Sequence, residues 1–384
     1  MTAPKLRFKE FDGDWTFKNL SDVSNKPLYG MNSAATDFDG ENKYLRITDI
    51  DEESHRFKFT KLSSPSDVIE EKYILQEGDL LFARTGASVG KSYIYDPDDG
   101  KVVFAGFLIK FGLKESVIPY FIFTQTLSEK FNNWVITNSM RSGQPGINAE
   151  EYSKWQVAFT SKPEQTKIAS FLSNVDEKIS QLTQKHELLN QYKQGMMQKL
   201  FSQQIRFKAD DGSEFGEWKS VFLGDISKPQ QWKTISSSEL TEIGYPVFGA
   251  NGYIGFYPKY NHINETIAVT CRGATCGEVT LVKAKSYITG NAMSIDEINE
   301  NEHSTLYIYY ALCFRGFKDV ISGSAQPQIV GNAIRKVTFQ IPCLEEQTKI
   351  ANFLFAIDQK IEVVAQQIEQ AKQWKKGLLQ QMFV

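Results

Sequence analysis

Apolar residues recur at alternating spacings of four and three in two long stretches of the chain, residues 164–201 and 346–383. A period of 3.5 residues sustained over about five heptads is typical of a coiled coil. We call these positions the seam: Ile168, Leu172, Val175, Ile179, Leu182, Leu189, Ile350, Leu354, Ile357, Ile361, Val364 and Ile368. The pattern favours two long helices that pair with each other over two surface helices that each pack on their own domain.

The two seam stretches are copies of one another, and further copied segments precede them. The segment EQTKIASFLSNVDEKI (164–179) returns as EQTKIANFLFAIDQKI (346–361), and QPGIN (144–148) matches QPQIV (326–330). Self-similarity at a fixed offset indicates a duplicated unit. The predicted order is variable domain, common helix, variable domain, common helix, with boundaries at 1–160, 161–205, 206–343 and 344–384.

The lysines of the seam predict how the two helices run. A parallel pair in register would place Lys193 opposite Lys375 inside the seam, where like charges repel each other. A pseudo-twofold relation between the repeats makes the helices antiparallel and separates the lysines. We also expect the seams to leave exposed apolar surface, in particular at Met196, Met197, Leu378 and Leu379.

The variable domains show a different pattern, with short aromatic and β-branched runs broken by glycine turns. Examples are VVFAGFLIKF (102–111) and YPVFGANGYIGFYPKY (245–260), the second of which contains the hairpin signal Asn251-Gly252. The predicted fold class is therefore α+β: two sheet-rich mixed domains, separated by two long helices that form an antiparallel coiled coil.

A glycine-rich loop occurs once in each variable domain. ARTGASVGKSYIY (83–95) ends in Gly-Lys-Ser, but Thr85 stands where a phosphate-binding loop requires its first glycine, and a strand-like run follows instead of a helix. AVTCRGATCGEVTLV (268–282) repeats the apolar run, a basic residue and the glycine spacing without Lys-Ser. Both segments predict a strand, a glycine turn and a strand, with the spacing of Gly86 to Gly90 repeated by Gly273 to Gly277.

Composition excludes several classes of protein. The chain is 41% hydrophobic and 23% charged, and its net charge is −3, as in ordinary soluble proteins. No apolar run approaches the roughly 18 residues of a membrane span, so a cytoplasmic location without membrane contact is expected. The four cysteines and four histidines lack metal-ligand spacing, which predicts free thiols and no metal site. Acidic residues outnumber basic ones in both variable domains, which by itself does not favour binding to nucleic acid.

The duplicated junctions QPGIN…PEQTKIASFLSNVDEKI and QPQIV…LEEQTKIANFLFAIDQKI, with EGDLLFARTGASVG and YPVFGANGYIGFY, resemble the specificity subunit of type I restriction–modification systems. The resemblance covers nearly the whole chain. It implies a non-catalytic subunit in which each target-recognition domain reads one half of an asymmetric bipartite sequence in double-stranded DNA. It further implies that the helices set the spacer and dock two adenine-N6 methyltransferase subunits, and that restriction subunits join them for cleavage. Such a chain has no cofactor of its own, because S-adenosylmethionine and ATP with magnesium belong to the partner subunits.

Base readout requires donors and acceptors on exposed loop tips that reach the major groove. The candidates for DNA contact are Arg84, Thr85, Ser88 and Lys91 in the first domain and Asn251, Arg272 and Thr275 in the second, with Arg141, Gln144 and Gln326 near the helix junctions. For the last three, a contact to the DNA backbone or to a partner subunit is an alternative to base readout, and each candidate is equally compatible with a structural role.

Two other functions compete with this interpretation. A single-chain DNA methyltransferase would need an Asn/Asp-Pro-Pro-Tyr/Phe motif and a glycine-rich cofactor loop, and the sequence contains neither. A coiled-coil scaffold whose two domains bind proteins or other ligands, without DNA sequence readout, remains the alternative.

Overall fold

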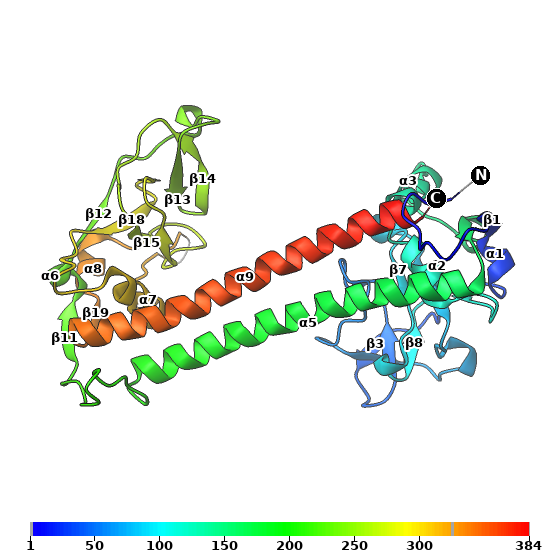
Figure 1. Cartoon of the computed structure of the whole chain (residues 1–384), viewed down its shortest axis with the longest axis horizontal. Coiled ribbons are helices and arrows are strands. Elements are labelled where there is room, and N and C mark those ends of the chain that lie inside the picture. The colour runs from blue at the N-terminus through cyan, green and yellow to red at the C-terminus, as the bar shows by residue number, and fades with distance from the viewer. Residues whose placement is uncertain (1–2, 324–325, 384) are drawn as a thin grey trace. The chain divides into compact units, whose positions relative to one another are not determined.

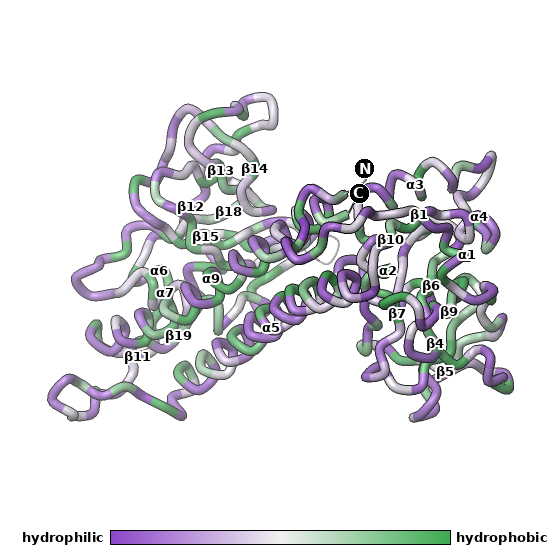
Figure 2. The backbone as a smooth tube through the Cα atoms, turned by 45° about the vertical axis from the view of Figure 1, so that its right-hand side comes forward, coloured by the Kyte–Doolittle hydropathy of each residue, from purple (hydrophilic) through white to green (hydrophobic). Residues whose placement is uncertain are grey.

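The two repeated seams form the two longest helices, α5 (Lys162–Phe201) and α9 (Leu344–Met382). Pro163 and Glu164 lie in the first turn of α5, where a missing N–H is harmless and a carboxylate favours the helix dipole. Figure 2 shows hydrophobic positions recurring among hydrophilic ones along both helices. The predicted seam residues are buried or half-buried along their whole length.

The structure is a computed structural model that describes residues 3–323 and 326–383, and it divides into two units. Unit 1 comprises Met1–Thr183 and Gln366–Val384, and unit 2 comprises Gln184–Ala365. Each unit therefore contains one variable domain, one half of α5 and one half of α9.

Inside each unit the two helix segments run antiparallel, as predicted. In unit 1 the Lys375 ammonium lies 2.6 Å from the Asp176 carboxylate, and farther along α9 Met382 shares a core with Ile168 near the start of α5. In unit 2 the equivalent ion pair joins Lys193 to Asp358 at 2.5 Å. The two lysines thus face aspartates of the opposite helix in separate units.

Unit 1 contains a four-stranded sheet in the order β2-β9-β6-β7 and three two-stranded pairs, β1-β10, β3-β5 and β4-β8. Its strands are β1 (Thr16–Asn19), β2 (Leu28–Tyr29), β3 (Ala35–Asp37), β4 (Lys43–Leu45), β5 (Ser63–Pro65), β6 (Asp79–Ala83), β7 (Ser92–Ile94), β8 (Val102–Phe104), β9 (Leu108–Gly112) and β10 (Gln156–Phe159). Its shorter helices are α1 (Leu20–Val23), α2 (Pro119–Gln125), α3 (Glu129–Ser139) and α4 (Ala149–Ser153). Figure 1 shows the end of α9 and the N-terminal segment together beside α2 and α3.

Unit 2 contains a four-stranded sheet in the order β12-β18-β15-β16, a three-stranded sheet β14-β13-β17 and the pair β11-β19. Its strands are β11 (Lys219–Phe222), β12 (Lys228–Gln231), β13 (Tyr245–Gly249), β14 (Gly252–Tyr257), β15 (Thr266–Thr270), β16 (Val279–Val282), β17 (Tyr287–Ile288), β18 (Ala292–Asp296) and β19 (Thr338–Ile341). Its shorter helices are α6 (Leu223–Ile226), α7 (Thr305–Arg315) and α8 (Gly331–Arg335). The larger sheet matches that of unit 1 strand for strand.

The expectation of exposed apolar residues at the end of α9 is wrong. Leu378 and Leu379 are each 5% exposed and belong to the main core of unit 1, together with Trp15 and Phe121. Met196 and Met197 are half-buried. The variable domains cover these helix ends because the end of each repeat packs on the domain of the other repeat.

A buried glutamate at the start of each long helix connects that helix to the beginning of the variable domain. Glu164 is 1% exposed, and it accepts hydrogen bonds from Arg7 Nε at 2.7 Å, from Trp15 Nε1 at 3.3 Å and from the Thr160 hydroxyl. These bonds offset the burial that would otherwise raise its pKa, so the pKa of Glu164 lies below its ordinary value.

Unit 2 repeats this arrangement with its own residues. Glu346 is fully buried and accepts from Arg206 Nε at 3.0 Å and from Trp218 Nε1 at 3.1 Å. The following glutamine is also repeated: Gln165 Oε1 accepts the N–H of Ile118, and Gln347 Oε1 accepts the N–H of Ser304. The duplicated Glu-Gln pair is therefore a structural anchor that ties the helix to the domain.

Within the described part of the chain, no helix combines the length and the apolarity that a membrane span requires.

Candidate nucleic-acid interface

The two glycine loops each connect antiparallel strands at the end of the central sheet, which confirms the predicted strand, turn and strand. In unit 1 the loop joins β6 to β7, and in unit 2 it joins β15 to β16. Gly86 and Gly273, the first glycines of the loops, have φ angles of +75° and +85°, in the left-handed region that favours glycine. This backbone requirement explains why the glycines are repeated although the lysine is not.

The repeated QPGIN and QPQIV segments form backbone hydrogen bonds with these loops. In unit 1 the N–H of Gly86 donates to the carbonyl of Pro145 at 2.9 Å, and the N–H of Ile147 donates to the carbonyl of Arg84 at 2.9 Å. The Gln144 side chain lies directly over Gly86, so close that a Cβ on Gly86 would be 2.8 Å from its Nε2. The motif and the loop therefore form one surface.

Unit 2 makes the same two backbone bonds, and they confirm the alignment of the loops by their glycines. Gly273 donates to Pro327 at 3.1 Å, and Ile329 donates to the carbonyl of Cys271 at 3.0 Å. The residue that corresponds to Arg84 is therefore Cys271. Arg272, the basic residue of this loop, corresponds to Thr85, as the equal spacing of Gly86–Gly90 and Gly273–Gly277 indicates.

The strand register and one further backbone bond give the same correspondence. The N–H of Arg84 donates to the carbonyl of Phe107 at 3.1 Å, and the N–H of Cys271 donates to the carbonyl of Asn291 at 3.2 Å. On the neighbouring strand, Tyr29 of β2 takes the place that Gln231 of β12 takes in unit 2. Two identical backbone frameworks therefore present different side chains.

In unit 1 this framework presents Arg84 between two aromatic rings. The Arg84 guanidinium carbon lies 5.2 Å from the centroid of the Tyr29 ring and 5.8 Å from that of the Phe107 ring, within cation–π distance of both. Tyr29 is 40% exposed and Phe107 is 60% exposed. We call these three residues the arginine clamp.

In unit 2 the same framework presents neutral polar groups. Cys271 is fully buried, and burial raises the pKa of its thiol. The Gln231 amide donates to the carbonyl of Gly290 at 2.9 Å and to Cys271 Sγ at 3.0 Å. Arg272, the next residue, is exposed and forms a β-bridge with Gln328.

The other candidates of unit 1 fall into two groups. Thr85 and Ser88 are half-buried in the loop, and Gln144 is exposed beside it, so these three lie near Arg84. Lys91 points into the domain, where its ammonium donates to the carbonyl of Ile50 at 3.1 Å and pairs with Glu52. A phosphate contact by Lys91 would require breaking these bonds.

Arg141 likewise makes bonds within its own domain. Its guanidinium donates to the Glu151 carboxylate at 2.5 Å and to the carbonyls of Asn138 and Met140. Sequence reasoning placed Arg141 and Gln144 together near the helix junction, but only Gln144 lies against the glycine loop.

The candidates of unit 2 converge on its loop. The Thr275 hydroxyl donates to the carbonyl of Ala250 at 2.7 Å, which brings the loop to the exposed Asn251 in the turn between β13 and β14. Gln326 is exposed and immediately precedes Pro327, the residue that holds the loop. Sequence reasoning missed Tyr29 and Phe107, since no local signal connects them to Arg84.

In each unit, a tyrosine, an aspartate and a lysine form a polar cluster where the two long helices meet. The Tyr120 hydroxyl donates to Asp176, and burial next to this carboxylate raises the pKa of Tyr120. In unit 2 the Tyr310 hydroxyl donates to Asp358 at 2.6 Å, and the pKa of Tyr310 is raised for the same reasons. Each aspartate thus connects its domain with the lysine of the opposite helix.

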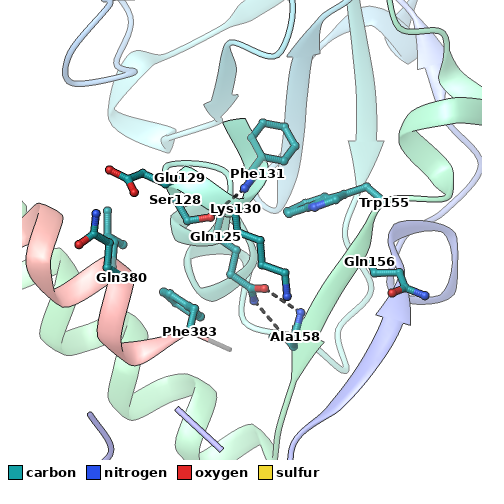
Figure 3. Close-up of a pocket in the computed structure, with 11 residues that line it drawn as sticks. Gln125, Ser128, Glu129, Lys130, Phe131, Trp155, Gln156, Ala158, Gln380 and Phe383 are labelled. Atoms are coloured by element: carbon teal, nitrogen blue, oxygen red, sulfur yellow. Dashed lines mark hydrogen bonds between the residues drawn. The ribbon is translucent and has the colours of Figure 1, made fainter. Parts of the chain in front are cut away.

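A pocket of about 290 Å³ opens in unit 1 where α9 ends against the domain. Figure 3 shows Gln380 of α9 and Phe383, which follows α9, on one side, with Ser128 and Glu129 at the start of α3 and Trp155 and Ala158 around β10. The Gln125 side chain forms its floor and bonds the backbone of Ala158 in both directions, at 2.8 and 3.0 Å. The pocket lies away from the glycine loop and belongs to the helix junction.

Comparison with known families identifies this duplicated framework. The family model of the type I restriction modification DNA specificity domain matches twice, at residues 12–191 and 216–373. The chain belongs to this family. Each match covers one variable domain and most of the helix that follows it, so the family's repeat coincides with the repeat in the sequence.

Relatives in this specificity-domain family span almost the full length of the chain. The putative type I restriction enzyme MjaX specificity subunit of Methanocaldococcus jannaschii is 27% identical, over 98% of this chain and 94% of the relative. The MjaVIII specificity subunit of the same organism is 24% identical over 97% and 94%. The crystal structure of a type I restriction-modification S subunit from M. genitalium has a TM-score of 0.68 at 17% identity, covering 100% of this chain and 99% of that one, and therefore shows the same fold.

Proposed function

We propose that this chain is the DNA specificity subunit of a type I restriction–modification complex. Each unit reads one half of an asymmetric bipartite target in double-stranded DNA, and the paired helices set the spacer. The observation that carries the proposal is that two equivalent loops, held by the same backbone bonds, present Arg84 in one unit and Cys271 in the other. A duplicated scaffold with different side chains at the same position is what reading two different half-sites requires.

The chain supplies recognition, and its partners supply the chemistry. Two adenine-N6 methyltransferase subunits dock on the helices and bind S-adenosylmethionine, and restriction subunits bring ATP and magnesium. The sequence supports this division, since it lacks the Asn/Asp-Pro-Pro-Tyr/Phe motif of a methyltransferase. One structural neighbour comes from work on the complex assembly of a type I system, which supports an assembly of this kind. The complex works in the cytoplasm, where bacterial and archaeal DNA lies.

The acidic balance of the chain makes the partners important for affinity. With a net charge of −3, the chain has little long-range attraction for phosphates, which dominate DNA affinity. We infer that the methyltransferase subunits contribute most of the phosphate contacts, while this chain contributes base readout.

The proposal is tested by co-expressing the chain with a methyltransferase subunit of its own system and mapping N6-methyladenine across the host DNA. Methylation confined to one bipartite motif is the expected result, and exchange of either variable domain should change only one half of the motif. A soluble, active complex that methylates no defined motif would contradict it and would favour the scaffold alternative.

A further inference from the structure

The Arg84 guanidinium makes no hydrogen bond to an acceptor in the part of the chain that the structure describes. Three of the four other arginines of unit 1 are paired: Arg7 with Glu164, Arg46 with Asp49 and Arg141 with Glu151. Across residues 3–323 and 326–383, by contrast, no carboxylate or carbonyl accepts a bond from the Arg84 side chain, and its Nε is covered by protein without a hydrogen-bond partner. An arginine held in place with unused donors is ready for an external acceptor.

The clamp restricts where this guanidinium can go. The Tyr29 ring is fixed through its hydroxyl, which accepts the N–H of Ala149 at the start of α4 at 3.1 Å. Phe107 is fixed through its backbone, since its carbonyl accepts the N–H of Arg84 itself. The two rings reduce the rotamer freedom of Arg84, so less conformational entropy is lost when it binds. Neither ring uses the guanidinium's hydrogen-bond donors.

Guanine and phosphate both offer two acceptors to an arginine fork, and the comparison between the units favours guanine. A contact to the phosphate backbone is independent of sequence and would serve both half-sites equally. Cys271, however, takes the equivalent position in unit 2, on the same backbone framework. The backbone framework is the same in both units, and the side chain at this position differs. The two half-sites likewise share a phosphate backbone and differ in their bases. A side chain that differs between the units is therefore suited to reading a base.

We propose that Arg84, held between Tyr29 and Phe107, reads a guanine in the half-site recognised by unit 1, and that unit 2 lacks this contact because Cys271 stands in its place. The inference rests on the proposed function of the chain as a DNA specificity subunit and assigns one base contact within it.

The test uses the complete complex with its methyltransferase subunits and three variants, Arg84→Ala, Arg84→Lys and Arg84→Gln. Methylation is measured on a library of targets in which each position of both half-sites is varied. The expected result is a loss of discrimination at one guanine of one half-site by about 5- to 150-fold, the range of one bidentate base contact. Arg84→Lys should lose most of this discrimination because lysine lacks the planar fork.

The flanking rings are tested with paired variants. Phe107→Leu and Tyr29→Leu should weaken discrimination at the same guanine, whereas Phe107→Tyr and Tyr29→Phe keep the rings and should preserve it. Arg46→Ala is the matched control, because this arginine of the same unit is already paired with Asp49 and should leave both half-sites unchanged.

Two results would overturn the inference while leaving the proposed function intact. The first is that Arg84→Ala weakens DNA binding equally on all targets and lowers the slope of log affinity against log salt concentration by about one. This result identifies a phosphate contact. The second is unchanged discrimination in Arg84→Ala with a folded complex. Base discrimination at the half-site read by unit 2 should not change in any variant and is the internal control. If the wild-type complex methylates no defined motif, the proposed function itself is overturned.

Discussion

The two units are alike where a helix meets its domain and different at the tip of the central sheet. At the junction, Glu164 and Glu346 each accept bonds from an arginine and a tryptophan. At the tip, Arg84 stands between two rings in unit 1, and a buried cysteine takes its place in unit 2. The shared contacts determine the architecture, and the divergent position lies beside the glycine loop, half-buried in unit 1 and buried in unit 2.

This difference shows how one framework accommodates two specificities. The glycine loop and the segment that holds it are connected by backbone hydrogen bonds, which do not depend on the side chains. Side chains at the tip can therefore change without loss of the fold. The junction has no such freedom, because its contacts are made by buried charged and aromatic side chains whose removal leaves unpaired groups.

The largest expected effect comes from lengthening the shared helices. Seven-residue helical insertions after both Thr183 and Ala365 leave the contacts inside each unit intact, because the two units divide at these positions. Each helix becomes longer by about 10 Å, so the DNA spacer should increase by roughly three base pairs. Mapping of N6-methyladenine measures the spacer length, and an unchanged spacer would show that the helices do not set the distance between the two half-sites.

A control insertion sharpens this result. Placing seven residues in α5 alone shifts it against α9, so the ion pairs of Asp176 and Asp358 no longer both form in register. We expect this single insertion to abolish motif-specific methylation.

The next largest effect is expected from removing the buried glutamate that ties a long helix to its domain, which should lower the stability of that unit. Glu164→Ala removes the buried carboxylate that accepts bonds from Arg7 Nε and Trp15 Nε1, and we expect the free energy of unfolding to fall by about 3 kcal/mol. Glu346→Ala should do the same in unit 2. Urea denaturation with hydrogen exchange resolved by unit measures both, and Glu150→Ala, which removes an exposed pair with Lys154, should stay within about 0.5 kcal/mol.

The seam ion pairs offer a reciprocal test of the antiparallel arrangement. Asp176→Lys should destabilise unit 1 by about 2 kcal/mol, because it places a second cation beside Lys375, whose side chain is only 14% exposed. The double variant Asp176→Lys with Lys375→Asp restores opposite charges and should recover most of the loss, although the Tyr120 hydroxyl loses its acceptor. A double-mutant cycle measures the coupling energy, and a value near zero would contradict the pairing.

The smallest expected effect is a dependence of stability on pH that unit 2 shows and unit 1 lacks. In unit 2 burial would raise the pKa of Asp296, but hydrogen bonds from His262 and Ser294 outweigh it and hold the pKa below its ordinary value. Its stabilisation is therefore complete above the unfolded pKa of about 3.9 and is lost as the pH falls through the lower folded value. Gly112 takes the corresponding position in unit 1, so only unit 2 carries this dependence.

The variant Asp296→Asn checks this prediction. It should lower the stability of unit 2 at pH 7 by about 1 kcal/mol and flatten its loss of stability in acid. Urea unfolding at a series of pH values measures the slope, and an unchanged acid slope would exclude Asp296 as its source.

The repeated architecture was readable from the sequence because it depends on periodicity and on copied segments. The seam spacing predicted both long helices, and the lysine argument predicted their antiparallel pairing within each unit. The repeated arginine, tryptophan and Glu-Gln residues were visible as well, although their mutual bonds were not. Such features are local or duplicated, so a single sequence displays them.

The proposed recognition surface depends on contacts that no local pattern encodes. Tyr29, Arg84 and Phe107 come from three separate strands or bends, and only the sheet register brings them together. Backbone hydrogen bonds also place Cys271, and not the basic Arg272, at the position of Arg84, in agreement with the equal glycine spacing of the two loops. The sequence by itself determined the duplication, the helices and the glycine turns, since these follow from spacing and backbone conformation. Which side chains stand at the recognition tip was decided by tertiary structure, because strand pairing joins residues far apart in the chain.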